Sequence, residues 1–114
     1  MSSFLARGES RGRVIAADEA LVIDETDGQN GTIIVSSTTG TKAATFSWDT
    51  PTDTLGGGKF QVYCAARSGG AYTVACTYGG SAGTVTIDAQ HEAPLFHRIG
   101  STLYCLALGG STFA

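Results

Sequence analysis

The residues best suited to covalent chemistry are three cysteines, at positions 64, 76 and 105. Cys64 and Cys76 lie on either side of a glycine-containing turn at 68–71, within apolar runs that alternate as strands do. This pattern predicts an antiparallel hairpin between 60–66 and 72–78, with Cys64 opposite Cys76. Such mid-strand positions lack the positive charge or helix N-terminus that makes a thiolate reactive. An odd number of cysteines without a Cys-x-x-Cys pair is not a disulfide framework. We therefore expect reduced, packed thiols, with a Cys64–Cys76 disulfide as the alternative.

The other polar residues do not complete a catalytic or metal site in the sequence. His91 and His97 would lie roughly 20 Å apart on a straight strand, too far to share one ion. The acidic run at 18–27 lacks the alternating aspartates of a calcium loop. Lys59 follows three glycines but precedes Phe60, whereas a phosphate-binding loop requires serine or threonine there. We expect a protein that is not an enzyme and has no cofactor and no metal.

Short strands are the elements that would position these residues. Turn residues recur every 8 to 12 positions, and no long segment shows helical periodicity; the best helical candidate is one or two turns over 14–20. Eight strands are predicted, over 20–24, 32–36, 43–48, 60–66, 72–78, 83–88, 93–98 and 102–108. This pattern indicates an all-β fold: an antiparallel β-sandwich or partly open barrel of about eight short strands with an extended N-terminal arm.

The strand predicted at 102–108 is apolar on both faces. Leu103 and Cys105 point one way, while Tyr104, Leu106 and Leu108 point the other way. A strand of this kind is covered on two sides, either within its own domain or by a neighbouring copy of the chain. Charged residues make up 15% of the chain, below the usual quarter, which favours self-association. We predict a subunit interface at Tyr104, Leu106 and Leu108.

We divide the 114 residues into an N-terminal arm, 1–19, and a β-sandwich domain, 20–114. Within a net charge of −3, the arm is basic and the remaining chain is acidic. The arm could extend along an acidic protein surface, or it could be a disordered tail without a role. If it docks, the expected contacts are an apolar anchor and three cations: Phe4, Leu5, Arg7, Arg11 and Arg13. A nucleic-acid partner is not expected, because aromatic residues do not alternate with these arginines.

No stretch approaches the roughly 18 apolar residues of a membrane span, so no membrane partner is expected. The N-terminus also lacks the apolar core of a secretory signal. We expect synthesis in the cytoplasm of the host cell.

The order of these elements resembles that of small β-structured bacteriophage virion proteins, above all capsid decoration (cement) proteins. The similarity covers about 20–108. It lies in a strand ending at a Thr-Pro turn (FSWDTP, 46–51), a glycine bend into an apolar strand (GGKFQVY, 57–63), a valine-threonine strand (TVTID, 84–88) and a closing hairpin (FHRIGSTLYCL, 96–106).

This resemblance implies a structural virion protein at the capsid surface. Such proteins bind the outside of a phage head as homotrimers and stabilise the shell, so the implied partners are the major capsid protein and further copies of the chain. The alternative is a carbohydrate- or receptor-binding β-sandwich module of a phage fibre or tail spike. In that case exposed aromatic rings would stack on sugars: Trp48, Tyr63, Tyr72 and Tyr78.

Overall fold

The computed structural model describes residues 11–47, 58–67 and 69–114. Within these ranges every regular element is a strand and there is no helix, which confirms the all-β class. The eleven strands are β1 (Gly12–Val14), β2 (Val22–Ile23), β3 (Gln29–Val35), β4 (Lys42–Ala43), β5 (Thr45–Phe46), β6 (Gly58–Cys64), β7 (Tyr72–Tyr78), β8 (Ser81–Ile87), β9 (Leu95–Ile99), β10 (Thr102–Ala107) and β11 (Thr112–Phe113).

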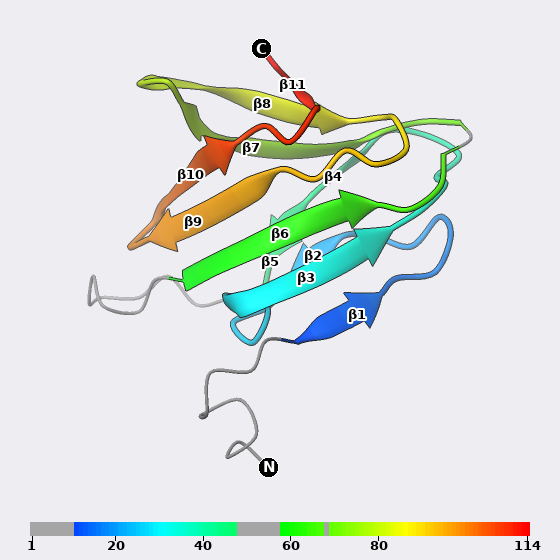
Figure 1. The fold of residues 1–114 in the computed structure, drawn as a ribbon, viewed down its shortest axis with the longest axis horizontal. Coiled ribbons are helices and arrows are strands. Elements are labelled where there is room, and N and C mark those ends of the chain that lie inside the picture. The colour runs from blue at the N-terminus through cyan, green and yellow to red at the C-terminus, as the bar shows by residue number, and fades with distance from the viewer. Residues whose placement is uncertain (1–10, 48–57, 68) are drawn as a thin grey trace.

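Nine of these strands form one large sheet, in the order β1-β3-β6-β9-β10-β7-β8-β11, with β4 paired to β7 (Figure 1). The remaining two, β2 and β5, pair with each other behind β3 and β6. The sheet is mixed and not antiparallel throughout, because β1–β3, β3–β6, β4–β7 and β7–β10 are parallel pairs. Parallel neighbours require crossover connections, which local turn signals in a sequence do not reveal.

The predicted hairpin between 60–66 and 72–78 was wrong. Strand β6 pairs with β3 and β9, whereas β7 pairs with β4, β8 and β10. The connection continues beside β3: Ala65 N donates to Val35 O at 2.9 Å, and Gly70 N donates to Thr38 O at 2.7 Å. These bonds lead the chain from β6 to β7, which lies at a separate position in the same large sheet.

Two hairpins follow the sequence signals closely. Strands β7 and β8 pair along their full length through Gly79 and Gly80, whose φ angles of 62° and 85° are those of a tight two-residue hairpin turn. The predicted closing hairpin is confirmed: β9 and β10 pair antiparallel from Ile99 and Thr102 onward. The helical turn expected over 14–20 is absent, because Asp18 has a φ of 66° and ends any helical path there.

One apolar core lies between the large sheet and the β2–β5 pair. Alternate residues of the long strands point into it and are fully buried, as are Leu21 and Ile23 of the opposite layer. Phe60 stacks on Phe96 with ring centroids 5.2 Å apart and meets Phe46 edge-on at 6.1 Å. These aromatic contacts join β6, β9 and β5 and so hold the two layers together.

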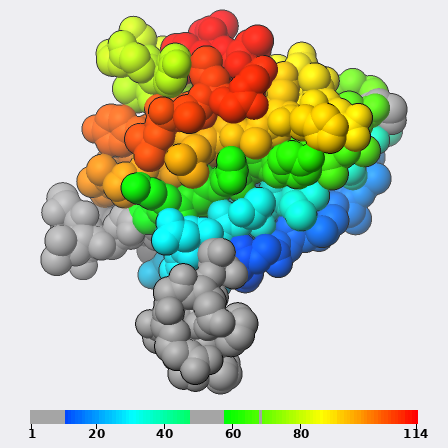
Figure 2. All heavy atoms as spheres, in the orientation of Figure 1, coloured from blue at the N-terminus to red at the C-terminus, as the bar shows by residue number. Residues whose placement is uncertain are grey.

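The side of the large sheet that faces away from this core is called the front face here. It consists of the outward side chains of β1, β3, β6, β9 and β10, and Figure 2 shows it running from blue through cyan and green to orange. Among the described residues, no strand lies over it. Its members are Val14, Thr32, Ile34, Lys59, Gln61, Tyr63, Leu95, His97, Ile99, Thr102, Tyr104 and Leu106.

Candidate functional site

The front face is where apolar side chains meet solvent. Five large apolar side chains are exposed in the described part of the chain, and four of them lie here: Val14, Ile99, Tyr104 and Leu106, at 39% to 71% exposure. Among the described residues of this face, Lys59 carries the single full charge. Interface cores are depleted in charge and enriched in tyrosine and large apolar groups, so this composition is typical of a protein-binding surface.

One end of this face carries the predicted subunit interface. Tyr104 lies opposite His97 on β9 and Thr77 on β7, and the residue is 39% exposed. The β9–β10 register shifts between Cys105 and Ala107, so Leu106 has no partner on β9 and is 46% exposed. We call Ile99, Tyr104 and Leu106 the β10 patch. Leu108, the third predicted residue, is instead half-buried against the core.

The other end of the front face contains a small hollow of about 80 Å³, which we call the Asn30 hollow. Asn30 has a φ of 60° and no partner on β6, because the β3–β6 register shifts between Gln29 and Gly31. This bulge turns β3 locally and opens the surface beside Lys59. The lining residues are Asn30, Gly31, Thr32, Lys59, Phe60, Gln61 and Leu95.

Gly31 forms part of the floor of this hollow and fixes its shape. Its N–H donates to Asp27 O at 2.8 Å, and a Cβ at this position would lie 2.7 Å from the same oxygen. A larger residue would therefore push the 24–28 turn away from the bulge. Gln61 is held from the other side, because its Nε2 donates to Ala93 O at 3.1 Å.

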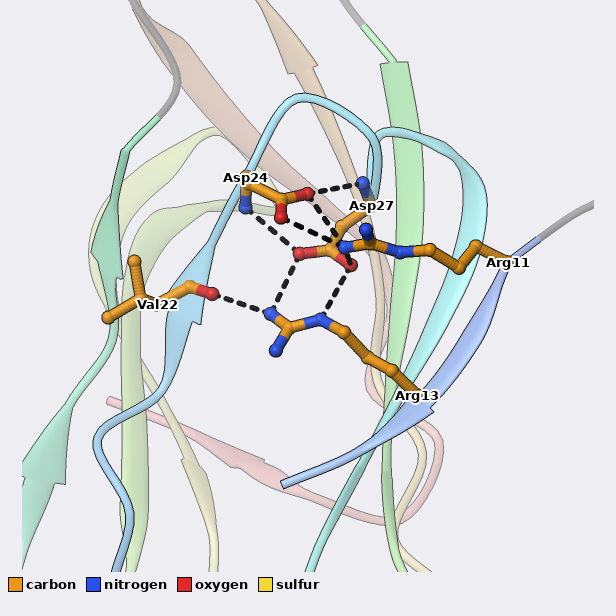
Figure 3. A network of polar contacts seen from close by, with 5 residues as sticks. All are labelled: Arg11, Arg13, Val22, Asp24 and Asp27. Atoms are coloured by element: carbon orange, nitrogen blue, oxygen red, sulfur yellow. Dashed lines mark hydrogen bonds and ion pairs between the residues drawn. The ribbon is translucent and has the colours of Figure 1, made fainter. Parts of the chain in front are cut away.

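Arg11 and Arg13, two of the residues predicted to dock on a partner, instead form ion pairs with aspartates of the same chain (Figure 3). Arg13 donates from Nε and Nη2 to the two carboxylate oxygens of Asp27, each at 2.9 Å, and Arg11 Nη2 reaches both Asp27 and Asp24. Strand β1 itself pairs with β3, so residues 12–14 are not extended away from the domain. Phe4, Leu5 and Arg7 lie outside the described residues.

Asp27 is the centre of this network. Its side chain is 1% exposed, and burial alone would raise the pKa of the carboxyl group. The hydrogen bonds from Arg13 and Arg11, and that from the Asp24 N–H at 2.9 Å, outweigh burial and lower this pKa to about 2. Arg13 Nη2 also donates to Val22 O at 2.6 Å, so the network joins β1 to both layers of the sandwich.

A larger depression, about 240 Å³, lies around Asp18 and is lined by Ala17, Asp18, Ser37, Thr38, Thr39 and Gly69. Asp18 Oδ1 accepts bonds from the Thr39 N–H and hydroxyl at 2.9 Å and from the Thr38 hydroxyl at 3.1 Å. These bonds, led by that from the Thr39 N–H, lower the pKa of Asp18 to about 2. Lys42 Nζ stands 3.6 Å from the same oxygen. The carboxylate therefore joins the loop that follows β1 to the loop that follows β3.

The three cysteines are free and buried, in agreement with the prediction of packed thiols. They do not face one another as the predicted hairpin required, because Cys64 lies opposite Val35 and Cys76 opposite Gly83. Burial raises the pKa of each thiol, and for Cys76 burial together with the nearby Cys105 raises it to about 11. Thiols of this kind are poor nucleophiles.

The histidines lie at separate places. The exposed His91 forms a hydrogen bond through Nδ1 with the Tyr63 hydroxyl at 2.8 Å, whereas His97 is half-buried on β9. Across the described ranges, no three His, Cys, Asp or Glu side chains are grouped to hold a metal ion.

Of the aromatic residues considered for sugar stacking, one is buried and two are partly exposed. Tyr72 is fully buried and donates its hydroxyl to Glu19 O at 2.7 Å. Tyr78 is half-buried against Phe113 at 5.3 Å between centroids. Tyr63 is half-exposed on the front face, and Trp48 lies outside the described residues.

Comparison with known protein families, characterised proteins and solved structures found no match for this chain. Within the described ranges, no helix is long and apolar enough to cross a membrane. The front face is therefore the feature from which we infer the function. Sequence reasoning found its apolar end from the doubly apolar strand, but missed the Asn30 hollow, for which the Asn30-Gly31 pair was the one available signal.

Proposed function

We propose that this chain is a capsid decoration protein: a structural virion protein that binds the outside of a phage head as a homotrimer and stabilises the shell. The observation that supports this proposal best is the front face, an uncovered sheet surface with exposed apolar groups and one full charge among its described residues. A specific interface buries about 800 Å² on each partner. The molecule measures 37 by 33 Å along its two longer axes, which leaves room for such a contact.

The two ends of this face suit two partners. The β10 patch is apolar and neutral, so copies of the chain can contact it without repulsion between like charges; we assign it to the trimer, with Ile99 joining Tyr104 and Leu106. The end of the face that contains Lys59, together with the arm that precedes Arg11, is assigned to the major capsid protein.

Stabilisation of the shell follows from mass action. A protein that binds the assembled lattice but not its separated subunits shifts the equilibrium toward the intact shell. In a trimer, three copies of each weak contact act together, and the resulting avidity exceeds that of one contact by ~10² or more. The carbohydrate-binding alternative has weaker support, because Tyr72 is buried and Tyr78 is half-buried.

The test uses heads of the phage that encodes this chain, produced without it. Size-exclusion chromatography with light scattering should give a trimer of 11.7 kDa chains. Adding the trimer should raise the temperature at which the heads release DNA, followed with a DNA-binding dye. Leu106→Asp should give a folded monomer that stabilises the heads less, whereas Val22→Asp, an exposed apolar position away from the front face, should behave as the wild type. A monomeric wild-type chain, or heads unaffected by saturating trimer, would contradict the proposal.

A further inference from the structure

The Asn30 hollow has the chemistry of a carboxylate-binding site. Besides Gln61, whose amide is bonded to Ala93 O, three of its side chains can donate hydrogen bonds to an anion: the Lys59 ammonium, the Asn30 amide and the Thr32 hydroxyl. They come from two neighbouring strands, and Asn30, at the bulge of β3, lines the hollow together with Lys59. Leu95 adds an apolar side chain to the lining.

Within the described residues, Lys59 makes no ion pair. The front face offers it no acid, because the described Asp and Glu residues lie in the turns at 18–27 and 88–92. Of these acidic residues, Asp27 is the nearest to Gly31 in the sequence. Its carboxylate binds Arg11 and Arg13. Among the described residues of the front face, none therefore supplies an anion for this hollow.

The size of the hollow limits that anion. Its volume of about 80 Å³ is somewhat more than two waters, each of which takes about 30 Å³ in the liquid. This accommodates a small anion such as a carboxylate. Charge-assisted hydrogen bonds to a carboxylate are shorter and stronger than those to a neutral group, so Lys59 would select the ionised form.

We propose that the Asn30 hollow binds the carboxylate of an Asp or Glu side chain on the coat protein that covers the front face. Lys59 makes the ionic contact, and Asn30 and Thr32 donate the hydrogen bonds that fix its position. This inference rests on the proposed function for the identity of the partner, but the chemistry of the hollow can be tested without a capsid.

The first experiment is an NMR titration of the full chain with sodium acetate, with sodium chloride at equal ionic strength and neutral acetamide as controls. Acetate should give saturable shifts of the Asn30 side-chain amide and the Thr32 backbone amide, and the controls should not. Lys59→Gln should weaken acetate binding about fivefold, the effect of one exposed ion pair. Lys42→Gln, the matched change beside Asp18, should leave it unaltered. Equal shifts with chloride, or equal affinity in Lys59→Gln, would overturn the site.

The second experiment measures binding to phage heads. Lys59→Glu should remain a trimer and bind heads at least tenfold more weakly than the wild type. Unchanged binding would overturn the assignment of the hollow to the coat protein while leaving the decoration function standing. Dissociation of the trimer would also overturn this assignment, because the carboxylate in the hollow would then belong to a second copy of the chain. If the wild type binds acetate but not heads, the proposed function fails and the hollow stands as a carboxylate site without that partner.

Discussion

Replacing Asp27 by asparagine should destabilise the fold strongly, although the new side chain has almost the same shape. The Asp27 carboxylate is 1% exposed and accepts bonds from Arg11, Arg13 and the Asp24 N–H. Removing one partner of a buried ion pair costs about 3 to 5 kcal/mol. The two arginine side chains are 30% and 28% exposed and can regain some water, so we expect a loss of about 2 to 4 kcal/mol.

Urea denaturation followed by circular dichroism measures this loss. With an m value of about 1.5 kcal/mol/M for a domain of this size, the midpoint should fall by roughly 1.3 to 2.7 M. Asp24→Asn is the matched control, because Asp24 touches the same Arg11 but is 41% exposed; it should cost at most about 1 kcal/mol. If the two variants were equally stable, the reasoning that places the network's energy at Asp27 would be refuted.

Because of the same network, the free energy of unfolding of the wild type should fall at acid pH. The folded-state pKa of Asp27 is about 2 and the unfolded value is 3.8, so its contribution is present above pH 4 and is lost as the pH falls toward 2. The difference corresponds to about 2 kcal/mol. Asp18, with a folded-state pKa also near 2, titrates in the same window. In Asp27→Asn this loss of stability between pH 4 and pH 2 should therefore be smaller but still present.

Three further outcomes are expected. Gly31→Ala should cost about 2 kcal/mol or more in urea, because its Cβ would lie 2.7 Å from a backbone oxygen, whereas Gly12→Ala, with open space around it, should change stability by less than about 0.5 kcal/mol. Tyr72→Phe should cost about 1 kcal/mol by the same assay, the value of its hydrogen bond to Glu19 O. The native chain should react with a thiol reagent far more slowly than the unfolded chain at pH 8, since Cys76 has a pKa of about 11; rapid reaction of the native chain would contradict its burial.

The sequence predicted strands well where alternation was long. Strand β7 has the predicted bounds, Tyr72–Tyr78, because seven residues alternate between core and surface. Strands β1 and β11 were missed, because with three and two residues they are too short to show an alternation of apolar and polar side chains. Pairing was predicted correctly where a tight turn joins the strands, as at Gly100, but not where a parallel neighbour comes from far along the chain, as β3 does for β6.

The candidate site divides in the same way. The outward position of Tyr104 and Leu106 follows from alternation alone, so the apolar end of the front face could be predicted. The Asn30 hollow depends on a register shift between two strands that are distant in sequence, and local residue patterns do not specify it. The arginines near the N-terminus were visible as cations, but their partner, Asp27, is 14 and 16 positions away, and only the β1–β3 pairing brings them together.

The large sheet ends in very short strands, three residues in β1 and two in β11. A short terminal strand offers few free N–H and C=O groups for another chain to extend, so stacking of copies edge to edge into fibrils is disfavoured. Copies of the chain can then lie close together at high local concentration without aggregating through their edge strands. Contacts between molecules are favoured on the broad surface of the sheet instead of at its edges.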